Sequence, residues 1–201
     1  MPTVLTVPTV RIVLASASPR RHELVAGLGL DADVIAADVD ESVRLGERPT
    51  EYVRRLAVEK ADAVATRAPG AVVIGADTTV DLDGRILAKP AAAAEAAAML
   101  RDLSARTHRV HTGVAVRSPA GTTTSVTTSF VTMAPLSEEA VAWYVATGEP
   151  LDKAGAYAVQ GVGAAFVTRV VGSVSNVVGL PLGELDFRWV PETVHDNMYL
   201  G

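Results

Sequence analysis

Residues 11–21 read RIVLASASPRR, and their pattern is the clearest indication of the fold class. Residues 11–15 are a short apolar run, which is typical of a buried β-strand. The small residues 16–18 interrupt the run, and Ser18 can cap a helix that has Pro19 at its first position. The stretch therefore predicts a strand, a tight loop and the N-terminus of a helix.

The same alternation of strand and helix continues along the chain. We expect further strands at residues 33–37, 71–75, 79–82, 85–87, 110–116, 122–132 and 166–171. We expect a first helix that ends at Gly29, a long helix capped by Thr50, an alanine-rich helix over 90–103, and a helix that begins after Ser137 and stops at Gly148. Asp83-Gly84 predicts a two-residue hairpin. Because strands and helices interleave throughout, the fold class is α/β.

The glycine-rich residues 152–163 predict a loop, and residues 177–185 predict a loop that turns helical. Residues 186–201 show no clear period. The chain has 201 residues, of which 49% are hydrophobic and 20% charged. This composition is typical of a globular protein, so we interpret residues 1–201 as one domain, or two closely packed lobes.

Charge and cysteine content exclude several classes of function. The formal net charge of −5 offers no broad positive field for nucleic acid or anionic lipid. The sequence has no cysteine, so disulfides and thiolate metal sites are excluded. No apolar run approaches the roughly 20 residues that span a bilayer, and the first residues carry no basic n-region. We therefore expect a cytoplasmic protein without a membrane or nucleic-acid partner.

The start of the first helix is a candidate anion site. Helix N-termini present free N–H groups and a positive dipole end. Ser16, Arg20 and Arg21 add a hydroxyl group and two guanidinium groups, which match phosphate oxygens. A capped surface helix with solvated arginines explains the same residues, so the stretch alone leaves both interpretations open.

Residues 75–79 (GADTT) hold a candidate catalytic carboxylate. We expect Asp77 at the carboxyl end of the strand over 71–75, where open α/β sheets place their ligand sites. A carboxylate there can hold a metal ion or accept a proton from water, but a turn aspartate would look the same. Glu41, Lys60 and Lys89 are unremarkable one by one, since most surface charges have no specific role.

The segment over 151–161 (LDKAGAYAVQG) is a candidate recognition loop. Gln160 has donor and acceptor groups that suit the edge of a base. Tyr157 fits the core equally well if its hydroxyl group finds a partner. The four histidines show no metal-ligand spacing, and we interpret them as non-catalytic.

Taken together, five motifs resemble the Maf family: LASASPRR (14–21), GADT (75–78), AKP (88–90), DKAGAYAVQG (152–161) and NVVGLPL (176–182). Their order and spacing also fit, over about residues 11–185, whereas the tail over 186–201 differs from the family's closing helix. The resemblance implies a fold like that of the inosine-triphosphate pyrophosphatases, with a long mixed sheet, flanking helices and two lobes around a central cleft. It also implies hydrolysis of a nucleoside triphosphate to monophosphate and pyrophosphate, a divalent cation (Mg²⁺ or Mn²⁺) and a homodimer.

The resemblance also implies roles for individual residues. Asp77 matches the proton acceptor, and Arg20, Thr78 and Gln160 match the positions linked to substrate choice. The polar cleft set is matched by Ser16, Arg21, Glu41, Lys60 and Lys89. Arg20 and Gln160 resemble the branch that acts on dTTP and UTP, because the branch that acts on 7-methyl-GTP typically has Trp in place of the first arginine.

These roles lead to a hypothesis for the reaction. Glu41 and Asp77 are the candidate ligands of the cation, the arginines and lysines neutralise the phosphates, and Asp77 deprotonates the attacking water. Alternatives are a 7-methyl-GTP pyrophosphatase, the same chemistry on a modified base, or a non-catalytic nucleotide-binding regulator of cell division. A nucleic-acid-binding module is disfavoured by the net charge of −5.

Overall fold

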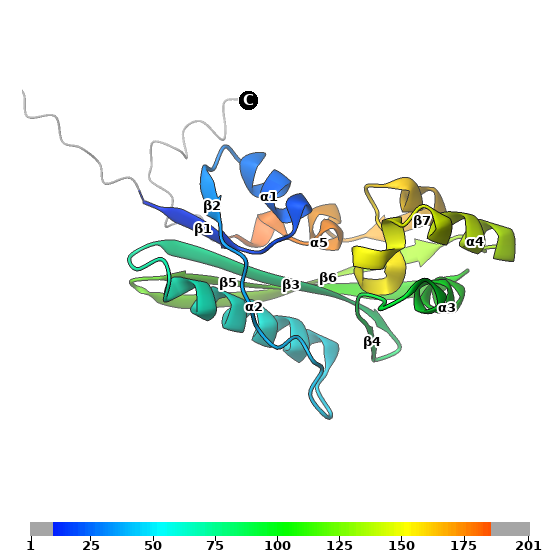
Figure 1. The fold of residues 1–201 in the computed structure, drawn as a ribbon, viewed down its shortest axis with the longest axis horizontal. Helices are drawn as coiled ribbons and strands as arrows, with labels where there is room; N and C mark the ends of the chain where they lie inside the picture. The colour runs from blue at the N-terminus through cyan, green and yellow to red at the C-terminus, as the bar shows by residue number, and fades with distance from the viewer. Residues whose placement is uncertain (1–9, 186–201) are drawn as a thin grey trace, which may run out of the picture.

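A mixed β-sheet runs the length of the molecule (Figure 1). The computed structural model describes residues 10–185, and within this range the sheet has seven strands. Their order is β2 (Ala32–Val34), β1 (Ile12–Ala15), β3 (Val72–Leu82), β5 (Thr107–Ser118), β6 (Gly121–Met133) and β7 (Val167–Val171), and β4 (Arg85–Leu87) pairs with β3 outside this path. β1 is parallel to β2 and β3, while the other pairs are antiparallel. The predicted α/β class with a long mixed sheet is confirmed.

Helices cover both faces of this sheet. The α-helices are α1 (Pro19–Ala26), α2 (Pro49–Ala65), α3 (Ala93–Leu103), α4 (Glu138–Ala146) and α5 (Val174–Val178). α2 lies on one face, and α1 and α5 lie on the other (Figure 1). None of the helices between residues 10 and 185 is long and apolar enough to cross a membrane.

Two glycines let α2 lie directly against the sheet. A Cβ atom on Gly75 would come within 2.2 Å of the Ala57 carbonyl oxygen, and one on Gly113 within 2.3 Å of the Val53 carbonyl oxygen. No side chain can occupy either position without pushing the helix away. This close approach sets the distance between the polar residues of α2 and those of β3.

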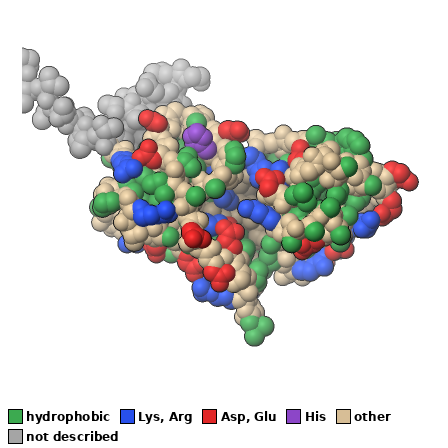
Figure 2. Space-filling model, in the orientation of Figure 1, with side chains coloured by type: hydrophobic (Ala, Val, Ile, Leu, Met, Phe, Trp, Pro, Cys, Tyr) green, Lys and Arg blue, Asp and Glu red, His purple; other side chains and the backbone are tan. Residues whose placement is uncertain are grey.

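Two of the clusters of buried apolar residues mark two lobes that share the long strands, and two smaller clusters pack α2 against the sheet. One lobe packs β1, α1 and the first half of β3 around residues such as Leu14 and Ile74. The other packs α3, α4 and the second half of β3 around residues such as Leu100 and Tyr144. Lysine and arginine side chains gather on the face where the two lobes meet (Figure 2). The predicted two-lobed arrangement is confirmed.

β3 is the main departure from the expected elements. The sequence indicated separate strands over 71–75 and 79–82, but the structure has one strand, because β5 pairs with β3 continuously from Val73 to Asp81. Asp77 therefore lies in the middle of a strand and not at its carboxyl end. On the opposite edge, β1 ends opposite Gly75, and the antiparallel pairing with β4 starts only at Val80, which faces Leu87. The edge of β3 between them opens at Asp77 and its neighbours.

Several expected helix ends also differ. Ser18 precedes α1 as predicted, but its side chain makes no capping hydrogen bond. α1 ends at Ala26, before Gly29, which instead turns the chain with a φ of 73°. α2 begins at Pro49, so Thr50 lies inside it, and the Arg48 N–H donates to Glu51 Oε2 at 3.2 Å. Each of these helix ends lies within a few residues of the predicted position, because several neighbouring residues can begin or end a helix.

Two other local predictions are confirmed, whereas the strand expected over 33–37 is only Ala32–Val34 and the loop expected over 152–163 contains 3₁₀ turns. Asp83 and Gly84 both have positive φ, 55° and 87°, as the hairpin requires. Ser137 caps α4 by accepting a hydrogen bond from the Ala140 N–H at 3.2 Å. The order expected in the 177–185 region is wrong, because α5 comes first and a loop with a 3₁₀ turn follows it. The tail over 186–201 lies outside the described residues.

Candidate active site

A cavity of about 360 Å³ opens between the two lobes. It lies where the edge of β3 is free, and it is lined by the β1–α1 loop, α2, the segment after β4 and the loop over 152–160. Every site residue predicted from the sequence contributes to its lining: Ser16, Arg20, Arg21, Glu41, Lys60, Asp77, Thr78, Lys89 and Gln160. The fold thus brings together residues that the sequence left scattered.

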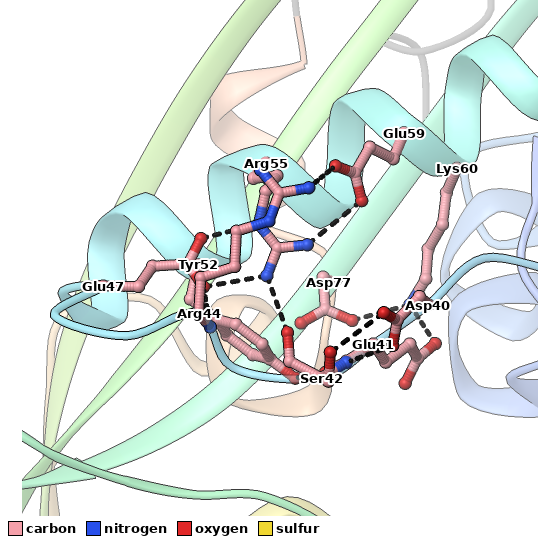
Figure 3. Close-up of polar contacts among 10 residues, drawn as sticks. All are labelled: Asp40, Glu41, Ser42, Arg44, Glu47, Tyr52, Arg55, Glu59, Lys60 and Asp77. Carbon is pink, nitrogen blue, oxygen red and sulfur yellow. Dashed lines mark hydrogen bonds and ion pairs between the residues drawn. The ribbon is translucent and has the colours of Figure 1, made fainter.

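Glu41, Lys60 and Asp77, here called the inner cluster, meet at one ammonium group (Figure 3). Lys60 Nζ lies 2.7 Å from Asp77 Oδ1 and 2.7 Å from Glu41 Oε1. The side chains of Lys60 and Asp77 are 9% and 10% exposed, whereas that of Glu41 is 47% exposed. One cation therefore joins a buried carboxylate to one that faces solvent.

The two carboxylates differ in basicity because they differ in burial. Burial raises the pKa of Asp77, although the Lys60 and Arg21 charges oppose it. Burial also acts to raise the pKa of Glu41, but the hydrogen bond and charge of Lys60 outweigh it, and the pKa lies below its ordinary value. Asp77 is consequently the better proton acceptor, while Glu41 stays ionised.

Arg21 is fixed by three hydrogen bonds. Its Nε donates to the Gly179 carbonyl at 2.7 Å, Nη1 donates to Ser16 Oγ at 3.1 Å, and Nη2 donates to Thr78 Oγ1 at 3.0 Å. Burial lowers the pKa of the guanidinium group, and the charge of Asp77 opposes this effect. Each terminal nitrogen keeps a second N–H group, so Arg21 can also donate to an anion in the cavity.

Thr78 lies next to Asp77 on β3 and points to the opposite face of the sheet. Its hydroxyl oxygen is 2.9 Å from Thr112 Oγ1, and Thr112 donates to the Asn176 carbonyl at 2.9 Å. Asn176 is fully buried, and its Nδ2 donates to the Val110 carbonyl and to Ser129 Oγ. Sequence reasoning assigned no role to Thr112 or Asn176, although Asn176 opens the NVVGLPL motif.

Arg20, Lys89 and Gln160, here called the rim, line the mouth of the cavity. Lys89 and Gln160 are exposed, and Arg20 is half-buried. Among residues 10–185, none of the three side chains has a hydrogen bond or ion pair. Lys153 also lines the cavity and donates to the Glu149 carbonyl at 2.8 Å. Lys153 belongs to the DKAGAYAVQG motif, but no role for it was predicted from the sequence.

The loop that carries Gln160 is held from both sides. Before Gln160, Tyr157 is buried and its hydroxyl group lies 2.8 Å from His108 Nε2, which places it in the core. After Gln160, the Glu149 carboxylate accepts hydrogen bonds from Val162 N at 2.9 Å and Gly163 N at 3.0 Å. Burial lowers the pKa of His108 to about 4, so this histidine is neutral near pH 7.

The acidic residues of the cavity are a partial donor set for a divalent cation. Between residues 10 and 185, no group of three or more histidine or acidic side chains could hold a metal ion alone. Glu41 and Asp77 nevertheless place two carboxylates on one side of the cavity. Mg²⁺ in nucleotide sites is usually held by one or two carboxylates together with phosphate oxygens and water. The donor set matches that pattern.

The fold and the cavity define a class: an α/β protein whose pocket, between two lobes, holds several lysine and arginine side chains beside a buried carboxylate. Comparison with known families is more specific, because the model of the Maf-like proteins matches residues 11–186. The chain belongs to the Maf family.

Similar proteins extend over most of the chain. The dTTP/UTP pyrophosphatase of Myxococcus xanthus (strain DK1622) is 57% identical over 173 residues, which cover 86% of this chain and 88% of the relative. The dTTP/UTP pyrophosphatase of Anaeromyxobacter dehalogenans (strain 2CP-C) is 56% identical over 178 residues, which cover 87% of this chain and 90% of the relative. Among solved structures, the Staphylococcus aureus Ham1 protein is 21% identical with a TM-score of 0.45, over 62% of this chain and 72% of that one.

Proposed function

We propose that this protein is a nucleoside-triphosphate pyrophosphatase that hydrolyses dTTP and UTP to the monophosphate and pyrophosphate. The observation that carries the proposal is Asp77, a buried carboxylate that shares Lys60 with Glu41 inside a cavity lined by further cations. The choice of pyrimidine nucleotides is supported by the two bacterial relatives, which are 57% and 56% identical to this chain and are named dTTP/UTP pyrophosphatases.

The cavity supplies positive charge from both lobes for a triphosphate. Arg20 and Arg21 come from the first lobe, and Lys89 comes from the segment after β4. Guanidinium groups bind phosphate oxygens through paired N–H donors, whereas a lysine acts as a point charge. A protein with a net charge of −5 can therefore bind a polyanion here, because the nearby lysine and arginine side chains act on the ligand more strongly than the distant acidic residues.

Asp77 is the proposed acceptor of the proton of the attacking water. The water oxygen bonds to the α phosphorus, the bond from that phosphorus to the bridging oxygen breaks, and pyrophosphate leaves with the bridging oxygen. The proton passes to Asp77, whose raised pKa makes it a stronger base than an ordinary aspartate. Arg21 and Lys89 stabilise the charge that develops on the phosphate oxygens.

Glu41 and Asp77 are the residues that would hold a divalent cation, Mg²⁺ or Mn²⁺, which would neutralise phosphate charge when bound. Thr78 and Gln160 are the residues proposed to read the base, and both line the cavity. The homodimer and the cytoplasmic location expected from the sequence stay predictions.

The direct test is pyrophosphate release from dTTP, UTP, CTP, GTP and 7-methyl-GTP, measured with Mg²⁺ or Mn²⁺. We expect release from dTTP and UTP, and a loss of about 10²–10⁴-fold in Asp77→Asn, which keeps the shape and removes the charge. Full activity in this variant would exclude Asp77 as the base. Preference for 7-methyl-GTP, or tight binding without turnover, would favour the corresponding alternative.

A further inference from the structure

Glu41 lies on a loop that apolar packing does not fix near its tip. Residues 35–48 connect β2 to α2 without a helix or strand. Val39 packs against α2, but after Glu41 the apolar residues Val43 and Leu45 point outward, with 48% and 107% of their surface exposed. The position of Glu41 must therefore be maintained by polar contacts.

Two residues of α2 bind the main chain of this loop (Figure 3). The Tyr52 hydroxyl group donates to the Glu41 carbonyl at 3.0 Å. Arg55 Nη2 donates to the Ser42 carbonyl at 3.0 Å. Both bonds act on backbone oxygens, so they fix where the chain runs at Glu41 and leave its carboxylate free to meet Lys60.

Arg55 is itself held firmly. Its Nε and Nη2 donate to the two carboxylate oxygens of Glu47 at 2.6 and 2.8 Å, and its Nη1 donates to Glu59 Oε2 at 3.1 Å. The side chains of Arg55 and Glu47 are 12% and 8% exposed. The hydrogen bond from Arg55 lowers the pKa of Glu47 to about 2. A bidentate pair with so little exposure holds its geometry far better than a surface ion pair.

Glu47, at the end of the loop, also binds the loop's main chain, because its Oε2 accepts a hydrogen bond from the Arg44 N–H at 3.0 Å. Two backbone carbonyls of the loop, on Glu41 and Ser42, are thus bound directly by α2, and the Arg44 N–H is bound by Glu47, a loop residue that Arg55 holds. Neither Tyr52 nor Arg55 lines the cavity. Their hydrogen bonds to the Glu41 and Ser42 carbonyls link them to the cavity through the loop.

We propose that Arg55 and Tyr52 are positioning residues for the reaction, which fix the main chain at Glu41 and Ser42 so that the Glu41 carboxylate stays beside Lys60 and Asp77. This inference rests on the proposed function, since Glu41 matters there as a cation ligand. The matched control is Arg54, the exposed neighbour of Arg55, which has no hydrogen bond or ion pair within residues 10–185.

The test is a double-mutant cycle with Glu41→Ala, read as kcat/KM for dTTP. We expect Arg55→Ala to lose on the order of 10-fold to 100-fold, as for other residues that orient a cation ligand. Tyr52→Phe, which lacks one hydrogen bond, should lose about fivefold, and Arg54→Ala should match the wild type. In the Glu41→Ala background neither substitution should cause a further loss. Losses that add fully would show a merely structural role and overturn the proposal.

Hydrogen exchange of the protein without nucleotide or metal gives a second readout that does not depend on activity. Amide protons at Ser42, Arg44 and Glu47 should exchange faster in Arg55→Ala and Tyr52→Phe, while those of the β3–β5 ladder stay protected as in the wild type. Unchanged exchange in the loop would overturn the proposal, even if the nucleotide panel confirms the enzyme. If Arg55→Ala fails to fold, Tyr52→Phe and Arg55→Lys carry both measurements.

Discussion

The inner cluster and the rim occupy the same cavity but are built in opposite ways. Lys60 and Asp77 are buried and already paired, with Lys60 shared between two carboxylates. Arg20, Lys89 and Gln160 line the cavity mouth without such partners in the described part of the chain. Buried charges need a partner in the free protein, whereas exposed charges are satisfied by water until a ligand replaces it. In the proposed function, the residues for proton transfer and cation binding are therefore arranged by folding, while the rim completes its contacts only with the substrate.

The largest effect is expected from Lys60→Gln. This change leaves Asp77 without its buried cation and places two carboxylates next to each other, so stability should fall by about 3 kcal/mol. Pyrophosphatase activity should fall by about 10²-fold or more, since a fixed charge in the cavity is lost. Urea unfolding and steady-state kinetics would measure the two effects. A stable and inactive variant would show that the inner cluster serves catalysis without supporting the fold.

Lys89→Gln tests the rim, where a charged side chain is expected to serve substrate binding and not stability. Because Lys89 is exposed, the substitution should leave the free energy of unfolding within about 0.5 kcal/mol of the wild type. Loss of one phosphate contact should lower kcat/KM by about tenfold. The same two measurements apply, with Lys60→Gln as the contrast. A loss of stability equal to that of Lys60→Gln would erase the distinction between cluster and rim.

The Glu47→Gln substitution tests how the ion pair between Glu47 and Arg55 makes the stability of the protein depend on pH. The folded pKa of Glu47, about 2, lies below its ordinary value of 4.5, so the ionised form is the one that stabilises the fold. The free energy of unfolding of the wild type should exceed that of Glu47→Gln by about 2 kcal/mol above pH 4.5. This difference should decline as the pH falls toward 2.

Unfolding in urea at pH 7, 5, 4 and 3 would measure this decline. The control is Glu138→Gln, whose ion pair with Arg101 is exposed and should contribute little at any pH. A difference between wild type and Glu47→Gln that stays constant with pH would contradict the assignment to the ionised carboxylate.

Gln160→Ala should have the smallest effect of these substitutions, and the effect should be on the preference between nucleotide substrates. Removing one base contact should reduce the preference for dTTP over GTP by about fivefold, with little change in stability because Gln160 is exposed. Ratios of kcat/KM for the two nucleotides give the answer, and Lys89→Gln is the control that should weaken both nucleotides alike. An unchanged ratio would remove Gln160 from the recognition of the base.

Local features of the fold could be predicted because they depend on neighbouring residues. Pro19 marks the start of α1, Ser137 caps α4, and Asp83-Gly84 makes the hairpin as expected. Helix ends were less predictable at Ser18 and Thr50, because several adjacent residues can serve the same purpose. The Tyr157 hydroxyl group met a core partner, His108, that the sequence could not identify.

The fold class, the order of the elements and the candidate polar residues could be predicted from the sequence, because side-chain periodicity and turn chemistry are local properties. Which of those residues meet, and where, depends on the tertiary structure. Asp77 was expected after a strand but lies in the middle of one, and it reaches the cavity because β1 stops opposite Gly75. Lys60 meets Asp77, 17 residues away, because Gly75 lets α2 lie against the sheet. Contacts between distant residues depend on where strands end and how closely helices pack, and neither is encoded in any short stretch of the chain.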